Sequence, residues 1–525
     1  MTSSNPSRPE PSLVPSVWQR VPVRMGASVA SNAVRLVLSF ASGMLIARGL
    51  GAARYGEYQF LLASVASLSQ FVDLGTSQAF FTFIARGPRH ARFFGFYFGW
   101  LALQFIAIAV TVGLLLPTRT LEVLWVGEDR AAILLAIVAT FLMNELWEAI
   151  SQLGEARRRT VIVQGALAGQ AAIHLALVAT AAYLGRLTVT LAFGFIIVEY
   201  GLLVVVLAAR FVRESIDPAR SAESFSATAT EFWTYCRPLI IYALSGFAFG
   251  FLDRWLLQRF GGSVQQGFFA VGQQLATISL LATTSILQVF WTEIAAASGA
   301  GHHERVATLY RSTSRALYFA AAWVSCLLLP YSREILSLTV GSSYAGAAAS
   351  FALMLLYPVH QSLGRINGSF LQAVGDTSAY ARIGVAVLAI SLPISYVLLA
   401  PRTATLPGLG LGAIGLTLKL IVVNVLSVNL LSYRIARRMA IAYDWRHQVI
   451  TIAALLAVGF ACRTIAYRML GGGESTLGMP GMAAAGTAYA ALTAALVYAT
   501  PVLVGLTASD VADLGRVCRT VVRVG

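Results

Sequence analysis

Charged side chains inside hydrophobic stretches are the residues of this chain whose chemistry demands an explanation. Arg35 lies in the apolar stretch 27–49, and Asn32 and several serines share its helical face at spacings of three and four. A guanidinium near the middle of a membrane-spanning helix costs roughly 3 kcal/mol. Such a residue usually faces water or an anionic partner, so a transport pathway is the first hypothesis.

Further cations lie in other apolar stretches, namely Arg254, Arg365 and Lys419. Cations suit an anionic headgroup such as a diphosphate, whereas amide side chains can both donate to and accept from sugar hydroxyls. The side chains expected to bind substrate are Arg35, Asn32, Arg365, Lys419, Gln274 and Gln70. Arg254 directly follows Asp253, so local pairing or snorkelling is the alternative for this residue.

Acidic residues also fall within the apolar stretches, and they allow two interpretations. Asp73, Glu145, Glu148 and Asp253 could neutralise intramembrane cations, as could Glu199, or one of them could exchange a proton or sodium ion during transport. The sequence does not choose among them. His174 is isolated in the sequence, and a hydrogen-bonded packing role is expected for it.

No other chemistry is indicated by residue type and spacing. The four cysteines, Cys236, Cys326, Cys462 and Cys518, have neither disulfide nor metal-ligand spacing. No catalytic residue, metal or cofactor is therefore expected.

The elements that position these residues are predicted to be membrane-spanning helices. Of the 525 residues, 57% are hydrophobic and 12% charged, which indicates an all-α polytopic membrane protein with about 14 transmembrane helices. We expect two pseudo-symmetric lobes of six helices each, followed by two C-terminal helices. The expected domains are a disordered cytoplasmic tail (1–26), an N-lobe (27–210), a cytoplasmic linker (211–237), a C-lobe (238–435), and the C-terminal helices with their tail (436–525).

The distribution of basic residues predicts the orientation. Arginine clusters recur in alternate connections, for example 86–92, 157–159 and 434–438, and the positive-inside rule places these connections and both termini in the cytoplasm. Topology and anionic lipid headgroups also account for the net charge of +15. Membrane lipids are therefore expected partners, and nucleic acid is not.

An internal repeat supports the two-lobe arrangement. Gly51 and Gly56 of the connection after the first span match Gly262 and Gly267 at a constant offset, each pair lying between an arginine and an aromatic residue. A second match joins Gly154 to Gly375. Each glycine suits a tight turn between antiparallel helices. Parallel repeats of this kind place the substrate between the two halves.

Three segments resemble a known group of transporters. They are LIARGLGAARYGEYQFLLASVASLSQFVDLGTSQAFFTFIAR (45–86), FLDRWLLQRFGG (251–262) and ILSLTVGSSYAGAAASFALMLL (335–356). They are similar to patterns of the polysaccharide-transporter (O-antigen/oligosaccharide flippase) branch of the multidrug/oligosaccharidyl-lipid/polysaccharide exporter superfamily. The resemblance implies a flippase of the bacterial inner membrane that moves undecaprenyl-diphosphate-linked oligosaccharide by alternating access for surface or exopolysaccharide biosynthesis. It also implies a polysaccharide polymerase and chain-length machinery as partners.

Two other functions compete with a flippase. A cation-coupled drug or small-molecule antiporter of the same superfamily is the alternative function. A membrane enzyme acting on the same lipids would need a long outer loop to hold an acceptor, and the longest predicted outer segment is the short connection 117–130. The protein is therefore not expected to be an enzyme.

Overall fold

The computed structural model describes residues 15–219, 224–280, 290, 293–294, 297, 302–470 and 478–506, and side chains are described from residue 31 onward, apart from 241, 242, 377 and 470. Helices dominate this part of the chain, and the one β-bridge within it joins Arg89 to Ile216. Contacts divide the chain into two compact units. The first comprises Met1–Gly43, Val72–Leu116 and Leu134–Ile240, and the second comprises Met44–Phe71, Pro117–Ile133 and Ile241–Gly525.

The helices are long and apolar enough for a polytopic membrane protein. Within the described residues, 11 helices meet this criterion, and a bent pair, Phe225–Leu239 and Ala243–Leu280, raises the number to 12. The number is lower than 14 because two pairs of predicted spans are merged. The helix Ser31–Asp73 contains most of the predicted spans 27–49 and 57–84, and the helix Ala243–Leu280 contains most of the predicted spans 238–259 and 266–290. The predicted all-α polytopic fold class is confirmed.

The first helix begins before its predicted span. Helix α1 covers Pro15–Asp73, so a helix includes the second half of the segment expected to be a tail, and residues 1–14 lie outside the described residues. Its backbone leaves the helical conformation at Gly51, where φ is 71° and ψ is 171°. A positive φ is accessible to glycine at little cost, so this residue forms the bend between the two predicted spans.

Helix α10 (Ile240–Ala276) repeats this bend. Gly262 has φ 75° and ψ 177°, nearly the same backbone conformation as Gly51. The sequence match between the two glycines therefore reflects a shared local structure. By contrast, Gly154 does not form the predicted turn. It lies inside α6 (Trp147–Ala156), and a Cβ there would come within 2.6 Å of Val163, so close helix packing explains this glycine.

The two bent helices cross closely in the second unit, and the contact is reciprocal. A Cβ on Gly56 would lie 1.7 Å from the carbonyl oxygen of Ser263, and a Cβ on Gly267 would lie 2.1 Å from that of Ala52. Ala52 and Gly56 are separated from Ser263 and Gly267 by the same offset that relates Gly51 to Gly262. The contact therefore has local pseudo-two-fold symmetry, as expected if the repeat is structural.

The Gly267→Ala variant is expected to be less stable than the wild type by roughly 1–3 kcal/mol, because the new methyl group meets a backbone oxygen, which cannot move as a side chain can. The matched control is Gly384→Ala in α16 (Thr377–Leu399) of the same unit, where no neighbouring atom lies within 4 Å of an added Cβ. The unfolding temperature of the purified protein measures the effect. Equal temperatures for the two variants would disprove the tight crossing.

The first unit packs its helices around aromatic side chains. Its elements after α1 are α2 (Thr76–Ala85), α3 (Ala91–Val110), η1 (Thr111–Leu115), α5 (Arg130–Thr140), η2 (Phe141–Leu146), α6 (Trp147–Ala156), α7 (Thr160–Tyr183), α8 (Val189–Ser215) and α9 (Phe225–Cys236). The rings of Phe80 and Tyr97 stack at 3.8 Å, and Phe83 contacts Phe232 edge to face at 5.1 Å. Phe232 anchors α9, which lies in the predicted linker, against α2 and α3.

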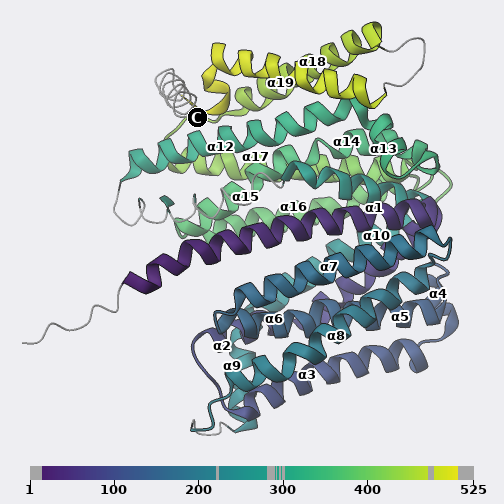
Figure 1. Cartoon of the computed structure of the whole chain (residues 1–525), viewed down its shortest axis with the longest axis vertical. Coiled ribbons are helices and arrows are strands. Elements are labelled where there is room, and N and C mark those ends of the chain that lie inside the picture. The colour runs from purple at the N-terminus through teal and green to yellow at the C-terminus, as the bar shows by residue number, and fades with distance from the viewer. Residues whose placement is uncertain are drawn as a thin grey trace, which may run out of the picture. The chain divides into compact units, whose positions relative to one another are not determined.

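The second unit contains the remaining helices. These are α4 (Thr118–Leu124), α10, α12 (His303–Leu328), α13 (Ser332–Thr339), α14 (Ala348–Met354), α15 (Tyr357–Ala373), α16 (Thr377–Leu399), α17 (Gly412–Arg438), α18 (Trp445–Leu470) and α19 (Met479–Ala499). Figure 1 shows α12, α15 and α17 side by side, with α18 and α19 on the far side of α12. The core between them includes Tyr318, Ile366, Phe370 and Tyr489, each fully buried. Packing in this core holds α15 and α17 in place, and with them the polar residues that these two helices carry.

Candidate functional site

Arg254 on α10 is a half-buried cation of the second unit that forms no ion pair among the described residues, although the Asp253 carboxylate interacts with it electrostatically. One terminal nitrogen donates to the Gln273 side-chain oxygen at 2.6 Å, and the guanidinium lies 4.5 Å from the ring centre of Phe269. The other terminal nitrogen is buried without a hydrogen-bond partner in the described structure. This cation therefore has bonding capacity that the described protein does not use.

Asp253, the neighbour of Arg254 in sequence, pairs with Lys419 on α17 instead. The ammonium group donates to one carboxylate oxygen, and the hydroxyl of Ser395 on α16 donates to the other at 2.6 Å. Lys419 is fully buried and lies 3.9 Å from the ring centre of Phe249. The sequence predicts a substrate contact for Lys419, but its ammonium group is neutralised inside the protein. The contacts favour the ion-pair interpretation for Asp253.

Gln274, predicted to contact substrate, belongs to a hydrogen-bonded chain that joins α10 to α1. The hydroxyl of Tyr55 donates to the Gln274 side-chain oxygen at 2.8 Å and accepts from the Gln59 amide at 2.9 Å. Tyr55 is fully buried and interacts electrostatically with Arg254. Sequence reasoning overlooked Tyr55, although it lies within the repeated motif. Gln70, farther along α1, is exposed beside Gly246.

Arg365 on α15 is a second half-buried cation of this unit without an ion pair in the described chain. Its neighbour Asn367 has a structural role, because its side-chain oxygen accepts from Tyr310 at 2.8 Å and its amide donates to Ser432 at 2.9 Å. This network joins α12, α15 and α17, and it holds the backbone from which Arg365 projects.

Arg35 is a half-buried cation of the first unit, and it also forms no ion pair in the described structure. Its terminal nitrogen donates to Asn32 at 3.4 Å, a long contact, and its Nε is buried without a partner in the described structure. No carboxylate of the described residues lies within ion-pair distance of Arg35. Asn32 is thus placed beside Arg35, as the helical spacing predicted. Three of the four predicted intramembrane cations, all except Lys419, form no ion pair in the described structure.

Asp73 acts as a cap at a break in the predicted second span. Leu74 and Gly75 have positive φ angles of 51° and 88°, and α2 begins at Thr76. The Asp73 carboxylate accepts from the backbone of Gly75 at 3.1 Å and from the backbone and hydroxyl of Ser77, both at 2.9 Å. These bonds satisfy donors at the start of the helix. A structural role therefore accounts for its contacts, and ion coupling by Asp73 stays a prediction.

Glu145 and Glu148 lie near Asp73 in the first unit. Glu145, in η2, interacts electrostatically with both of the other carboxylates. Glu148 is exposed at the start of α6 and accepts from the Gln152 amide at 3.1 Å. The structure thus brings these three predicted carboxylates into one acidic region, and no cation neutralises Glu145 or Glu148 among the described residues.

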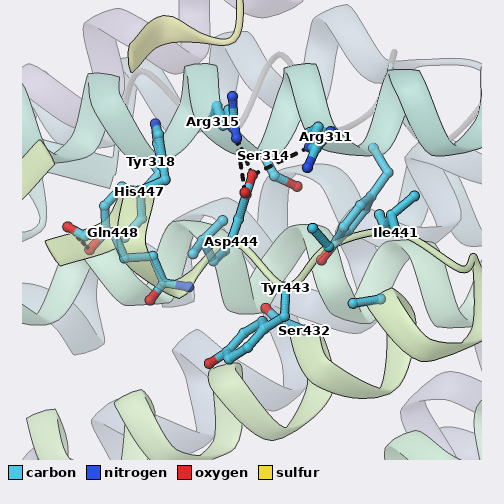
Figure 2. Close-up of a pocket in the computed structure, with 14 residues that line it drawn as sticks. Arg311, Ser314, Arg315, Tyr318, Ser432, Ile441, Tyr443, Asp444, His447 and Gln448 are labelled. Carbon is cyan, nitrogen blue, oxygen red and sulfur yellow. Dashed lines mark hydrogen bonds and ion pairs between the residues drawn. The ribbon is translucent and has the colours of Figure 1, made fainter. Parts of the chain in front are cut away.

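A small pocket with a cavity volume of about 40 Å³ lies elsewhere in the second unit, between α12, α17 and the connection 439–444 (Figure 2). Asp444 accepts from Arg315 at 2.7 and 2.8 Å, and Arg311 lies 3.6 Å away. Burial alone would raise the pKa of Asp444, but the hydrogen bond and charge of Arg315, with Arg311, hold that pKa below its usual range. Two arginines share one carboxylate, so the pocket keeps a net positive charge, and Asp444 occupies the inward side of Arg315 through two hydrogen bonds.

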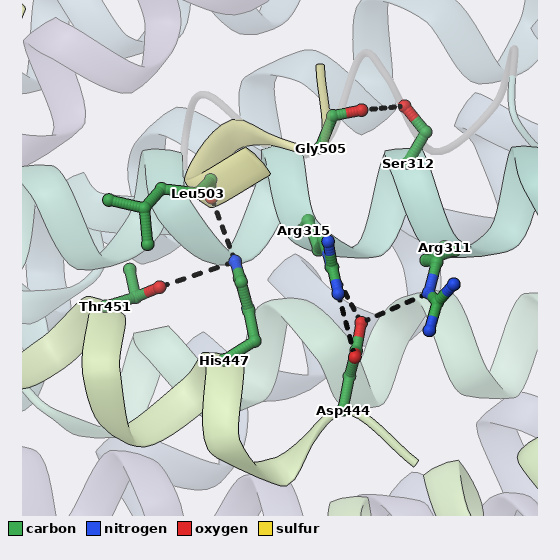
Figure 3. Close-up of polar contacts among 8 residues, drawn as sticks. All are labelled: Arg311, Ser312, Arg315, Asp444, His447, Thr451, Leu503 and Gly505. Carbon is green, nitrogen blue, oxygen red and sulfur yellow. Dashed lines mark hydrogen bonds and ion pairs between the residues drawn. The ribbon is translucent and has the colours of Figure 1, made fainter. Parts of the chain in front are cut away.

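The same region fastens the C-terminal helices to α12 (Figure 3). His447 on α18 bonds the carbonyl oxygen of Leu503 at 2.9 Å, and Ser312 on α12 donates to the carbonyl oxygen of Gly505 at 2.9 Å. Together with the Asp444 ion pairs, these bonds connect α18 and the residues after α19 to one face of α12. The last two helices are therefore integral to the second unit.

Metal-ligand clusters are not found among the described residues. Cys236, Cys326 and Cys462 are buried and unpaired there, and Cys518 lies outside the described residues. Thr284 and Gln288, which extend the polar face of Gln274 in the sequence, also lie outside them. The polar side chains that could bind a ligand in the described part of the chain are therefore cations, amides and carboxylates.

No protein-family model matches the chain, and no curated protein matches its sequence. Solved structures do share its fold. Lipid II flippase MurJ in an inward closed conformation aligns with a TM-score of 0.66 and 10% identity over 90% of this chain and 98% of that chain. An outward-facing multidrug resistance MATE family transporter of the MOP superfamily aligns with a TM-score of 0.53 and 15% identity over 80% of this chain and 95% of that chain.

A MOP superfamily transporter from Pyrococcus furiosus, described as having a binding pocket of reversed polarity, aligns similarly. Its TM-score is 0.51, with 14% identity over 80% of this chain and 95% of that chain. At these identities the likeness concerns the fold. The chain therefore has the membrane-transporter fold seen in MurJ and in these MOP-superfamily transporters.

Proposed function

We propose that the chain is a flippase that moves an undecaprenyl-diphosphate-linked oligosaccharide across the bacterial inner membrane by alternating access. The fold supports a transporter, and one protein with this fold is described as a lipid II flippase. The three segments that resemble polysaccharide transporters, 45–86, 251–262 and 335–356, support a substrate lipid that carries an oligosaccharide. A polysaccharide polymerase and chain-length machinery would then act on the exported product.

The observation that carries this proposal is the set of unneutralised arginines. Arg35, Arg254 and Arg365 lie in apolar helices, are half-buried, and form no ion pair with a carboxylate among the described residues. A buried charge is tolerated when it is paired or faces water, and an unpaired one is costly. A diphosphate would supply the missing anion, since each phosphate oxygen accepts charge-assisted hydrogen bonds.

The experiment that tests the substrate is deletion of the gene followed by analysis of the lipid-linked intermediates. Complete oligosaccharide units should accumulate on undecaprenyl diphosphate in the cytoplasmic leaflet, and the surface glycan should disappear. The wild-type gene should restore export. Normal surface glycan and normal intermediate levels in the deletion strain would exclude this substrate.

A cation-coupled drug antiporter is the second candidate, favoured by the acidic region of Asp73, Glu145 and Glu148 in the first unit. Carboxylates in an apolar environment attract cationic molecules rather than diphosphates. Drug susceptibility of the same deletion strain separates the two functions. Increased sensitivity to cationic drugs with unchanged lipid-linked intermediates would favour the antiporter.

The orientation is also a proposal and has its own test. Since the arginine clusters lie in alternate connections, a periplasmically active reporter fused at Gly525 should be silent, and the same reporter inserted in the connection 117–130 should be active. Activity of the fusion at Gly525 would show that the C-terminus is periplasmic and that the predicted orientation is wrong.

A further inference from the structure

The pocket beside Asp444 contains more cations than carboxylates. Arg311 and Arg315 line it, and Asp444 is the one carboxylate among the described residues that do so. Asp444 accepts from Nε and one terminal nitrogen of Arg315, so this guanidinium is held in place. The Arg311 Nε lies 3.6 Å from the same carboxylate, and Arg311 forms no hydrogen bond in the described structure. The donors of Arg311 are therefore available to a second anion.

A buried hydroxyl group faces the same pocket. Ser314 lies between the two arginines on α12 (Figure 2), is 9% exposed, and has a hydroxyl without a hydrogen-bond partner in the described structure. The nearby Tyr310 hydroxyl donates instead to Asn367 at 2.8 Å. A buried hydroxyl without a partner is costly unless a water or a ligand bonds it. The cavity of about 40 Å³ has room for roughly three water-sized groups, which matches the free oxygens of one phosphate.

Exposed aromatic side chains beside the pocket indicate the level of the lipid headgroups. Trp445 directly follows Asp444 and is 50% exposed, and Tyr433 lies on α17, which lines the pocket, and is 46% exposed. Exposed Trp and Tyr are enriched where a membrane meets water. The guanidinium groups of Arg446 and Arg437 lie over these two rings, at 5.6 and 5.3 Å from their centres. At this level the nearest phosphates are those of membrane lipids.

We propose that Arg311, Arg315 and Ser314 bind the headgroup phosphate of an anionic membrane lipid, apart from the transported substrate. Arg311 and Ser314 donate to the phosphate oxygens, and Arg315, held by Asp444, adds positive charge. Basic pockets between membrane helices bind acidic headgroups in this way. Asp444 directly precedes α18, and Arg311 and Arg315 lie on α12. A lipid bound here therefore strengthens the junction between α12 and the C-terminal helices.

The test measures the unfolding temperature of the purified full-length chain in a neutral detergent with added short-chain phosphatidylglycerol. This lipid should raise the unfolding temperature by at least about 2 °C, because a ligand that binds the folded state stabilises it. Zwitterionic phosphatidylcholine with the same chains, and inorganic phosphate, should have clearly smaller effects. Arg311→Ala should weaken phosphatidylglycerol binding by about tenfold or more, and this variant should fold because Arg311 forms no hydrogen bond in the described structure. Ser314→Ala should act in the same direction.

The matched control is Arg446→Ala, because Arg446 is an exposed arginine near the pocket that does not line it. This variant should bind phosphatidylglycerol nearly as tightly as the wild type does. Equal losses in Arg446→Ala and Arg311→Ala would show general attraction to a basic surface and would refute the site. Wild-type binding in both Arg311→Ala and Ser314→Ala would also refute it. If inorganic phosphate stabilises the chain as much as phosphatidylglycerol, the site takes a soluble anion and the proposed lipid is wrong.

Discussion

Arg254→Ala should lower export of the surface glycan by about ten- to hundredfold without lowering the amount of protein in the membrane. A hydrogen bond to a charged group contributes roughly 1.5–3 kcal/mol, which corresponds to this factor. Truncation removes one internal hydrogen bond, to Gln273, and the contact with the Phe269 ring, while the other terminal nitrogen of the guanidinium has no partner in the described structure. Arg35→Ala and Arg365→Ala should act in the same direction. Glycan export and membrane abundance are measured on the same cells.

Two further variants control this experiment. Arg254→Lys keeps the charge but loses the planar fork, so export should be partly retained. Arg382→Ala removes an exposed arginine of α16 and should leave export unchanged. Full export by all three alanine variants of Arg35, Arg254 and Arg365 at normal abundance would show that these cations do not bind the substrate.

Lys419→Met should destabilise the protein by roughly 3–5 kcal/mol, because it leaves the buried carboxylate of Asp253 without its counter-charge. The double variant Asp253→Asn/Lys419→Met should regain most of this loss, since no uncompensated charge remains and the asparagine oxygen can still accept from Ser395. Thermal unfolding of the wild type, both single variants and the double variant gives the coupling energy of the pair.

This comparison also separates the two interpretations of Lys419. The sequence predicts a substrate contact, whereas the structure places its ammonium group on Asp253. If Lys419→Met is as stable as the wild type but fails to export glycan, the substrate contact is correct. If it is unstable and the double variant restores both stability and export, the ion pair is structural.

Several features of this protein could be predicted because they depend on residues close together in sequence. Apolar runs of about 20 residues identify membrane helices, since the bilayer offers the backbone no hydrogen-bond partners. The repeated glycines predicted matching bends, and Gly51 and Gly262 have nearly identical backbone angles. The helical spacing of Asn32 and Arg35 predicted that they would be neighbours.

Other features could not be predicted because they depend on contacts between distant segments. The second predicted span breaks after Asp73, where a carboxylate can cap a new helix only if the chain turns there. Gly154 matched Gly375 in sequence, yet packing against α7 and α8 explains the first. In both cases the local sequence is compatible with two structures, and packing against the surrounding helices determines which one forms.

The sequence by itself determined which charges lie in the membrane, because hydropathy is a property of each stretch of chain. Only the tertiary structure decided which of them are neutralised. Asp253 is adjacent to Arg254 but pairs with Lys419, 166 residues away. Neighbours on a helix point about 100° apart, whereas residues on packed helices can meet directly. For this reason Arg254 keeps free bonding capacity, and Glu199 finds His174 across two helices.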